Sequence, residues 1–134
     1  MVPREQRGRV RRRRGSLSRG GTTELAVQTA AHTRTGVERV VRAACEAAAD
    51  RSGHLTYVTK SNVLTHGSGF WDDVVAEVSA DYPDVTARHR YVDAANLALV
   101  AHPDAFDVVV APNLFSDILT DAAAADLRHR LAHP

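Results

Sequence analysis

Apolar and polar positions vary along the chain in a pattern that predicts alternating strands and helices. A β-capable segment comes first, and a helix follows in which Val37, Val41, Ala44 and Ala48 recur at helical spacing. Thr33 or Thr35 can cap the start of this helix. The expected strands cover residues 24–30, 54–59, 85–92 and 106–111. The expected helices cover residues 34–50, 70–80 and 94–101, and a last helix begins at residue 114.

This order of elements predicts an α/β fold in which a mostly parallel sheet is layered with helices. Sheets of this kind bind ligands beyond the carboxyl ends of their strands. Three polar features follow expected strands directly, namely Lys60, Asp93 and residues 113–121. Their position after strands predicts that they belong to one site.

Charge is distributed unevenly along the 134 residues, although the formal net charge is only +1. The first 19 residues hold eight of the sixteen arginines and a single acid, and the remainder of the chain is acidic overall. An arginine run can neutralise phosphates, which makes an arginine-tail nucleic-acid binder one alternative function. No aromatic residue precedes Tyr57, so stacking on bases is absent there. We therefore expect residues 1–21 to be a poorly ordered segment, residues 126–134 to be a polar tail, and nucleic acid not to be a partner.

The single cysteine and the hydropathy of the chain predict the cellular compartment of the protein. Cys45 is the only cysteine, which excludes an internal disulfide and fits a reducing compartment. It falls on an alanine-rich helix, where we expect a buried and inert thiol. No apolar run approaches the roughly 18 residues that a membrane span requires. We expect a cytoplasmic protein that has no membrane partner.

Lys60 is the only lysine of the chain. Arginine keeps its proton near neutral pH, whereas a lysine can lose it when its surroundings favour the neutral amine. A single lysine at the end of an apolar strand is therefore a candidate for proton chemistry. The alternative is that one lysine among many arginines has arisen by chance.

Asp117 and Asp121 lie four residues apart on an expected helix, so both carboxylates project from one face. Like charges at this spacing repel, and a bound cation would offset the repulsion. Mg²⁺ or Mn²⁺ suits such oxygen ligands, and Asp93 could supply a third carboxylate. The alternative is that the two aspartates only interact favourably with the helix dipole.

Four segments of the chain form specific motifs in combination, namely residues 33–40, 58–64, 91–95 and 113–121, and the last of them is the most specific. Taken together, they resemble the β-decarboxylating dehydrogenases, a family that includes 3-isopropylmalate, isocitrate and tartrate dehydrogenases. The resemblance extends in family order over residues 22–125. It implies that this range is a partial substrate-binding, metal-binding and dimerisation domain with a partial isopropylmalate-dehydrogenase-like fold.

The resemblance also implies roles for individual residues. Lys60 matches the lysine that binds the substrate and handles its hydroxyl proton and the later enol. Asn62 matches the asparagine near the nicotinamide end of the cofactor. The metal-binding aspartates, which hold Mg²⁺ or Mn²⁺, correspond to Asp93, Asp117 and Asp121.

The reaction implied is hydride transfer from a 2-hydroxy acid to NAD or NADP, followed by loss of the β-carboxylate. Residues 62–64 after the lysine resemble the 3-isopropylmalate branch of the family. The family pattern also implies a homodimer with shared active sites, in which Lys60 and Asp93 act in the site of the partner subunit. NAD versus NADP and the particular 2-hydroxy acid stay open at this point.

The sequence departs from the family pattern in several places. Residues 4–6 resemble the entry to a family loop, so Arg4 matches a substrate-carboxylate arginine, but the arginine-rich run replaces the catalytic tyrosine. Ser116 stands where glycine is usual, and family members are more than twice as long. We therefore expect a fragment with little activity alone, flanked by ends that come from an altered reading frame. The alternative is a non-catalytic remnant that acts as a dimerisation or metal-binding module.

Overall fold

The computed structural model describes residues 15–132, and it divides the chain into two units, Met1–His32 and Thr33–Pro134. Arg4 and the arginine run at residues 11–14 lie outside the described residues. The substrate-binding role expected of Arg4 and the nucleic-acid alternative therefore stay predictions.

The first unit contains a β-hairpin. Strand β1 (Gly15–Leu17) pairs antiparallel with β2 (Leu25–Val27). A tight turn joins them, in which the Gly21 amide donates to the Ser18 carbonyl at 2.9 Å. This differs from the poorly ordered segment expected up to residue 21. It also places the first expected strand in a separate two-stranded sheet, because β2 pairs with its neighbour in sequence.

The second unit is built on a parallel three-stranded sheet, which confirms the predicted α/β fold. The strand order is β4-β3-β5, with β3 (His54–Thr59) between β4 (Thr86–Tyr91) and β5 (Val108–Val110). Thr56 lies opposite Arg88 on one side and Val109 on the other. The sheet contains three of the four expected strands, and β4 and β5 are shorter at both ends than predicted.

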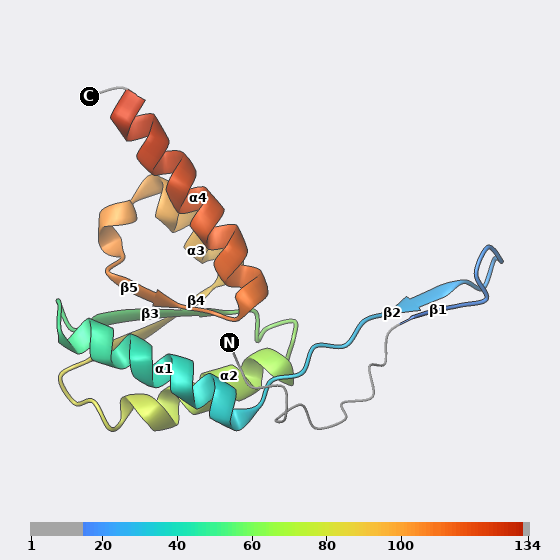
Figure 1. Ribbon diagram of the computed structural model, residues 1–134, viewed down its shortest axis with the longest axis horizontal. Coiled ribbons are helices and arrows are strands. Elements are labelled where there is room, and N and C mark those ends of the chain that lie inside the picture. Colours follow the sequence, from blue (N-terminus) through green and yellow to red (C-terminus); the bar gives the residue numbers. More distant parts are fainter. Residues whose placement is uncertain (1–14, 133–134) are drawn as a thin grey trace. The chain divides into compact units, whose positions relative to one another are not determined.

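Helices cover both faces of this sheet (Figure 1). Helices α1 (Arg34–Ala49) and α2 (Gly67–Ser79) pack together on one face. Helices α3 (Val92–Ala101) and α4 (Asn113–Ala132) pack together on the other, and a 3₁₀ turn (Pro103–Ala105) precedes β5.

Each face of the sheet has its own hydrophobic core, because successive side chains of a strand point to opposite faces. On β3, Leu55 packs in the core under α1 and α2, whereas Val58 packs in the core under α3 and α4. Cys45 is fully buried in the first core, and this burial raises the pKa of its thiol. The expectation of a buried cysteine is thus confirmed.

Local interactions explain where α1 begins and where β3 starts. Thr33 is the N-cap of α1, and its hydroxyl oxygen accepts the Gly36 amide at 3.2 Å. Gly53 follows the helix with φ +74°, a conformation that favours glycine. A Cβ at Gly53 would lie 2.7 Å from the carbonyl oxygen of Asp84, so the close approach of these two turns also requires glycine.

Three helix boundaries differ from the prediction. Residues 67–69, expected to break the chain, form the first turn of α2. Helix α3 begins at Val92 with Tyr91 as its N-cap, so Asp93 lies inside the first turn and does not cap it. Helix α4 continues to Ala132, so most of the segment expected as a polar tail is helical.

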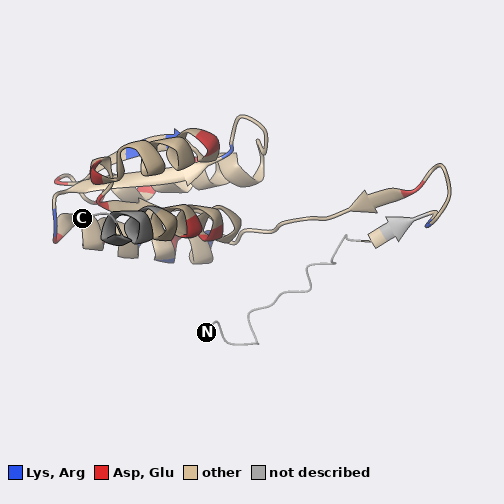
Figure 2. Ribbon diagram, turned by 90° about the horizontal axis from the view of Figure 1, so that it is seen from above, with Lys and Arg blue, Asp and Glu red and all other residues tan. Residues whose placement is uncertain are grey.

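Every one of the four α-helices carries acidic residues, which Figure 2 marks along the ribbon. Some of them form ion pairs between helices, such as Arg34 with Glu77 at 2.6 Å. These pairs are exposed, and solvent screening keeps their contribution to stability small. Among the residues described, no helix is both long and apolar enough to cross a membrane.

Candidate active site

Lys60 and Asp93 come together at the carboxyl edge of the sheet. Strands β3 and β4 run parallel, with Thr59 opposite Tyr91, so the residues that follow them lie at the same edge. The Lys60 ammonium group donates to the Asp93 carboxylate and forms an ion pair with it. The Lys60 side chain is 25% exposed and that of Asp93 is 70% exposed. The predicted neighbourhood of these two residues is therefore present within one chain.

The Asp93 carboxyl has a pKa below its ordinary value. The main cause is the hydrogen bond from Lys60, and the backbone amide of Asp93 and the positive charge of Lys60 act in the same direction. Partial desolvation opposes the shift, and each of the two hydrogen bonds has a larger effect than this desolvation. Asp93 is therefore ionised at neutral pH.

We expect the Lys60→Met substitution to return the pKa of Asp93 towards its ordinary value of 3.8, because the main cause of the shift is then removed. A carboxyl-detected NMR titration measures this value directly. In the wild type, the ion pair stabilises the fold fully when the pH is above the pKa that Asp93 has in the unfolded chain. This stabilisation is lost as the pH falls through the lower pKa that Asp93 has in the folded chain. The pKa of Asp107, lowered mainly by the Ser52 hydroxyl at the other end of the sheet, should not change. An unchanged pKa of Asp93 in the variant would contradict the assigned cause.

A partly buried polar network supports the residue that precedes Lys60. Thr59 is fully buried, and its hydroxyl donates to Asp72 at 2.8 Å. His89 Nε2 lies 2.8 Å from the same hydroxyl oxygen. A hydroxyl has a single proton, so His89 must donate its Nε2–H to Thr59. The network joins α2, β3 and β4 next to Lys60.

The backbone of Lys60 has its own contact, because its amide donates to the hydroxyl of the buried Ser68 at 3.3 Å. Sequence analysis missed Ser68 and the network of Thr59, Asp72 and His89. The four residues come from three separate elements, and only Ser68 and Asp72, four apart on α2, are related by spacing along the chain.

Asp117 and Asp121 lie about one turn apart near the start of α4, and both are exposed. The Asn113 side-chain amide donates to Asp117 at 3.5 Å. Ser116, which stands where the family has glycine, donates its hydroxyl to the Ala111 carbonyl at 3.1 Å. Two carboxylates on one helical face fit a hard divalent cation.

A third carboxylate does not join Asp117 and Asp121 within this chain. Among the described residues, no group of three or more His, Cys, Asp or Glu side chains converges in a way that could hold a metal ion. Asp93 is instead paired with Lys60. Of the five expected site residues that the structure describes, four thus lie in two pairs, and the fifth, Asn62, is exposed in the turn between β3 and α2.

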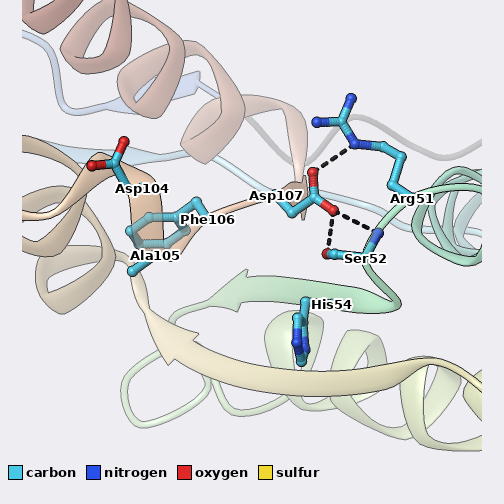
Figure 3. Close-up of a pocket in the computed structure, with 7 residues that line it drawn as sticks. All are labelled: Arg51, Ser52, His54, Asp104, Ala105, Phe106 and Asp107. Carbon is cyan, nitrogen blue, oxygen red and sulfur yellow. Dashed lines mark hydrogen bonds and ion pairs between the residues drawn. The ribbon is translucent and has the colours of Figure 1, made fainter.

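A pocket of about 570 Å³ lies at the opposite end of β3 and contains none of the predicted site residues (Figure 3). Its polar groups bind one another: the Asp107 carboxylate accepts Arg51 Nε at 2.6 Å, and it also accepts the Ser52 amide and hydroxyl. These bonds, chiefly that of the Ser52 hydroxyl, lower the pKa of Asp107. We interpret this cluster as a structural connection between the α1–β3 turn and the chain before β5.

The fold is that of the isocitrate/isopropylmalate-type dehydrogenases, and solved structures share it. The β-decarboxylating dehydrogenase of Thermococcus kodakarensis is 35% identical with a TM-score of 0.73, and the match covers 84% of this chain and 32% of that one. The isocitrate dehydrogenase of Methylococcus capsulatus is 34% identical with a TM-score of 0.70, and the match covers 84% of this chain and 33% of that one.

The family model of isocitrate/isopropylmalate dehydrogenase matches residues 1–127, and the chain belongs to this family. The match includes the first 21 residues, of which only residues 4–6 were noted from sequence as resembling the family. The 3-isopropylmalate dehydrogenase of Corynebacterium efficiens is 50% identical over 111 residues, which are 83% of this chain and 33% of that enzyme. The 3-isopropylmalate dehydrogenase of Thermobifida fusca is 51% identical over 112 residues, which are 83% of this chain and 32% of that enzyme. The chain thus spans about a third of the length of these relatives.

Proposed function

We propose that this chain is the metal- and substrate-binding part of a β-decarboxylating dehydrogenase. The enzyme oxidises a 2-hydroxy acid resembling 3-isopropylmalate with NAD or NADP and then releases the β-carboxylate. The observation that carries the proposal is the Lys60–Asp93 pair, formed at the sheet edge where α/β proteins bind ligands. The identity of about half of the matched residues with 3-isopropylmalate dehydrogenases supports the choice of substrate class.

In this proposal Lys60 moves the protons of the reaction. As a neutral amine, Lys60 takes the proton of the substrate hydroxyl group while hydride leaves the carbon that bears this group. As ammonium, it later returns a proton to the enol. Asn62, in the turn after Lys60, would hold the nicotinamide end of the cofactor. Mg²⁺ or Mn²⁺, held by Asp117 and Asp121 with Asp93, supplies Lewis-acid polarisation of the hydroxyl and carbonyl oxygens when it is bound.

Two copies of the chain are needed to bring the three aspartates together. Exposed apolar side chains lie on α3, where Leu97 is 70% and Val100 is 55% exposed. The spacing of 93, 97 and 100 places Asp93 on the same face of α3 as these residues. This face is therefore an apolar stripe that ends at the Lys60–Asp93 pair.

Helix α4 carries a matching stripe. Leu114 is 67% and Ile118 is 48% exposed, and the spacing of 114, 118 and 121 places Asp121 on the same face. Large exposed apolar side chains on two packed helices are typical of a protein interface. A homodimer formed through these stripes brings Asp93 of one copy towards Asp121 of the other, which gives shared active sites.

Metal binding tests this proposal without requiring turnover. We expect the Asp121→Asn substitution to weaken binding of Mn²⁺, followed by electron paramagnetic resonance, by at least about tenfold, because a charged ligand is lost. Asp73→Asn is the matched control, since Asp73 is exposed on α2, away from the candidate ligands. Equal Mn²⁺ affinity of the two variants would exclude Asp121 as a ligand.

Turnover separates the enzyme from the non-catalytic alternative. The chain is mixed with NAD, Mg²⁺ and 3-isopropylmalate, and NADH formation is compared with that of the Lys60→Ala variant. A rate above the variant supports catalysis by this chain. Equal rates, together with Mn²⁺ binding, would assign it the role of a metal-binding module.

A further inference from the structure

The sheet face that packs against α1 and α2 carries a cluster of polar and aromatic side chains at its carboxyl edge. Tyr57 and Thr59 on β3 lie opposite His89 and Tyr91 on β4, and all four point to this face because side chains alternate along a strand. The His89 ring contacts both tyrosines, with ring centroids 4.9 Å from Tyr57 and 4.8 Å from Tyr91. These contacts hold the ring in one place beside Thr59.

Helix α2 contributes the acidic member of this cluster. Asp72 accepts the Thr59 hydroxyl, and its carboxylate oxygen lies 3.9 Å from His89 Nε2. Only 27% of the Asp72 side chain and 27% of the His89 side chain are exposed. Burial, and after it the negative charge of Asp72, raises the pKa of Tyr57. Polar groups that are largely withdrawn from water are costly to leave unpaired, so these groups hold one another in place.

The single proton of the Thr59 hydroxyl determines the direction of the hydrogen bonds. This proton goes to the carboxylate of Asp72, so the bond between His89 and Thr59 requires a proton on Nε2. Nδ1 of a neutral His89 is then without a proton. The cluster therefore has one arrangement of hydrogen bonds, and this arrangement fastens the end of β3 to both α2 and β4.

We propose that Asp72, Thr59 and His89 are positioning residues that hold Lys60 against Asp93. The inference rests on the proposed function, in which Lys60 moves protons, and it assigns the groups that determine where this amine lies. Thr59 is the last residue of β3, and Lys60 follows it directly. His89 belongs to β4, which leads into the first turn of α3 and so to Asp93. The cluster thus joins the two strand ends that carry the ion pair.

Helix α2 holds the same stretch of backbone at a second point. The Lys60 amide donates to the hydroxyl of Ser68, which is 4% exposed and lies one turn before Asp72. Two bonds from one helix therefore hold the consecutive residues Thr59 and Lys60. A free lysine side chain has many conformations, and a fixed backbone restricts it to those that reach Asp93.

The single lysine of the chain allows a direct test. Protein made with isotope-labelled lysine gives NMR signals of Lys60 alone, and carbon relaxation at its Cε atom measures how firmly the side chain is held. The Asp93→Ala variant defines the order parameter of an unpaired Lys60. We expect Thr59→Val, which removes the hydroxyl and nearly keeps the shape, to shift the order parameter most of the way to that value. Thr59→Ser keeps the hydroxyl and should retain the wild-type value.

Two further variants make this result specific. Thr56→Val is the matched control, because Thr56 is also buried on β3 but points to the other face of the sheet. His89→Phe keeps a ring beside the tyrosines and removes the donor, so it should loosen Lys60 even if Thr59→Val fails to fold. Circular dichroism melting curves show which variants are folded.

The tautomer of His89 is a second readout. Nitrogen NMR of the wild type, at a pH above the ordinary pKa of histidine, should show the His89 proton on Nε2 and not on Nδ1. The opposite tautomer, or an unchanged Lys60 order parameter in both Thr59→Val and His89→Phe, would overturn the proposal. An equal shift in Thr56→Val would overturn it as well. None of these measurements requires turnover or bound metal, so failure of the proposed function would leave their expected results unchanged.

Discussion

Replacing Leu97 and Leu114 together by glutamate is expected to separate the proposed homodimer into monomers. These are the two most exposed large apolar side chains of the described residues, 70% and 67%, and they lie on adjacent packed helices. Each charge would have to be desolvated in an apolar interface, so we expect the dimer dissociation constant to rise at least about 100-fold. Sedimentation velocity over a concentration series measures this constant.

The Val40→Glu variant is the control for this experiment. Val40 is 41% exposed on α1, on the opposite face of the sheet, and its replacement should leave the dissociation constant unchanged. A wild type that stays monomeric at roughly 100 μM, well above the micromolar constants of ordinary interfaces, would remove the case for shared active sites. If the dimer forms, the double variant should also bind Mn²⁺ more weakly, because Asp93 of the partner is then absent.

The Leu55→Ala substitution is expected to lower the free energy of unfolding by about 2–5 kcal/mol, the range found when a buried leucine is truncated. Leu55 is 1% exposed and lies on the central strand β3, where it packs beneath α1 and α2. Truncation leaves a cavity that neighbouring strands and helices fill only in part. Urea denaturation followed by circular dichroism measures the change.

Leu64→Ala provides the comparison for Leu55. Leu64 is 51% exposed in the turn after β3, so its truncation should change stability by less than about 0.5 kcal/mol. Both variants must be measured at one protein concentration, because dimer formation would add to the apparent stability. Similar decreases in the free energy of unfolding for the two variants would show that β3 is not the centre of the core.

Elements whose local pattern and tertiary surroundings agree were predicted well. The helix at residues 34–50 was found at Arg34–Ala49, and the strand at residues 54–59 was found with the same bounds. Helical spacing of valines and alanines, an N-cap threonine and a following glycine all act within a few residues. Prediction failed at residues 67–69, where two glycines suggested a break. The burial of Ser68 and its bond to Lys60 favour a helical turn there.

The candidate site was predicted in part for a similar reason. Parallel strands align their carboxyl ends, so the order of strands was enough to expect Lys60 and Asp93 near each other. Sequence could not show that they form an ion pair, or that Asp117 and Asp121 belong to a separate group. Those distances depend on how α3 and α4 pack on the sheet.

The sequence by itself determined the α/β class, the burial of Cys45 and the family, because these depend on periodicity and on short motifs. Only the tertiary structure decided which strands pair, that β2 belongs to a hairpin with β1, and that the network of Thr59, Asp72 and His89 lies next to Lys60. It also decided that β5 lies beside an apolar pocket and that, among the described residues, only β3 pairs with it. The physical reason is that strand pairing and helix packing bring together residues that lie tens of positions apart in the sequence. The spacing of residues within a short segment does not predict such contacts.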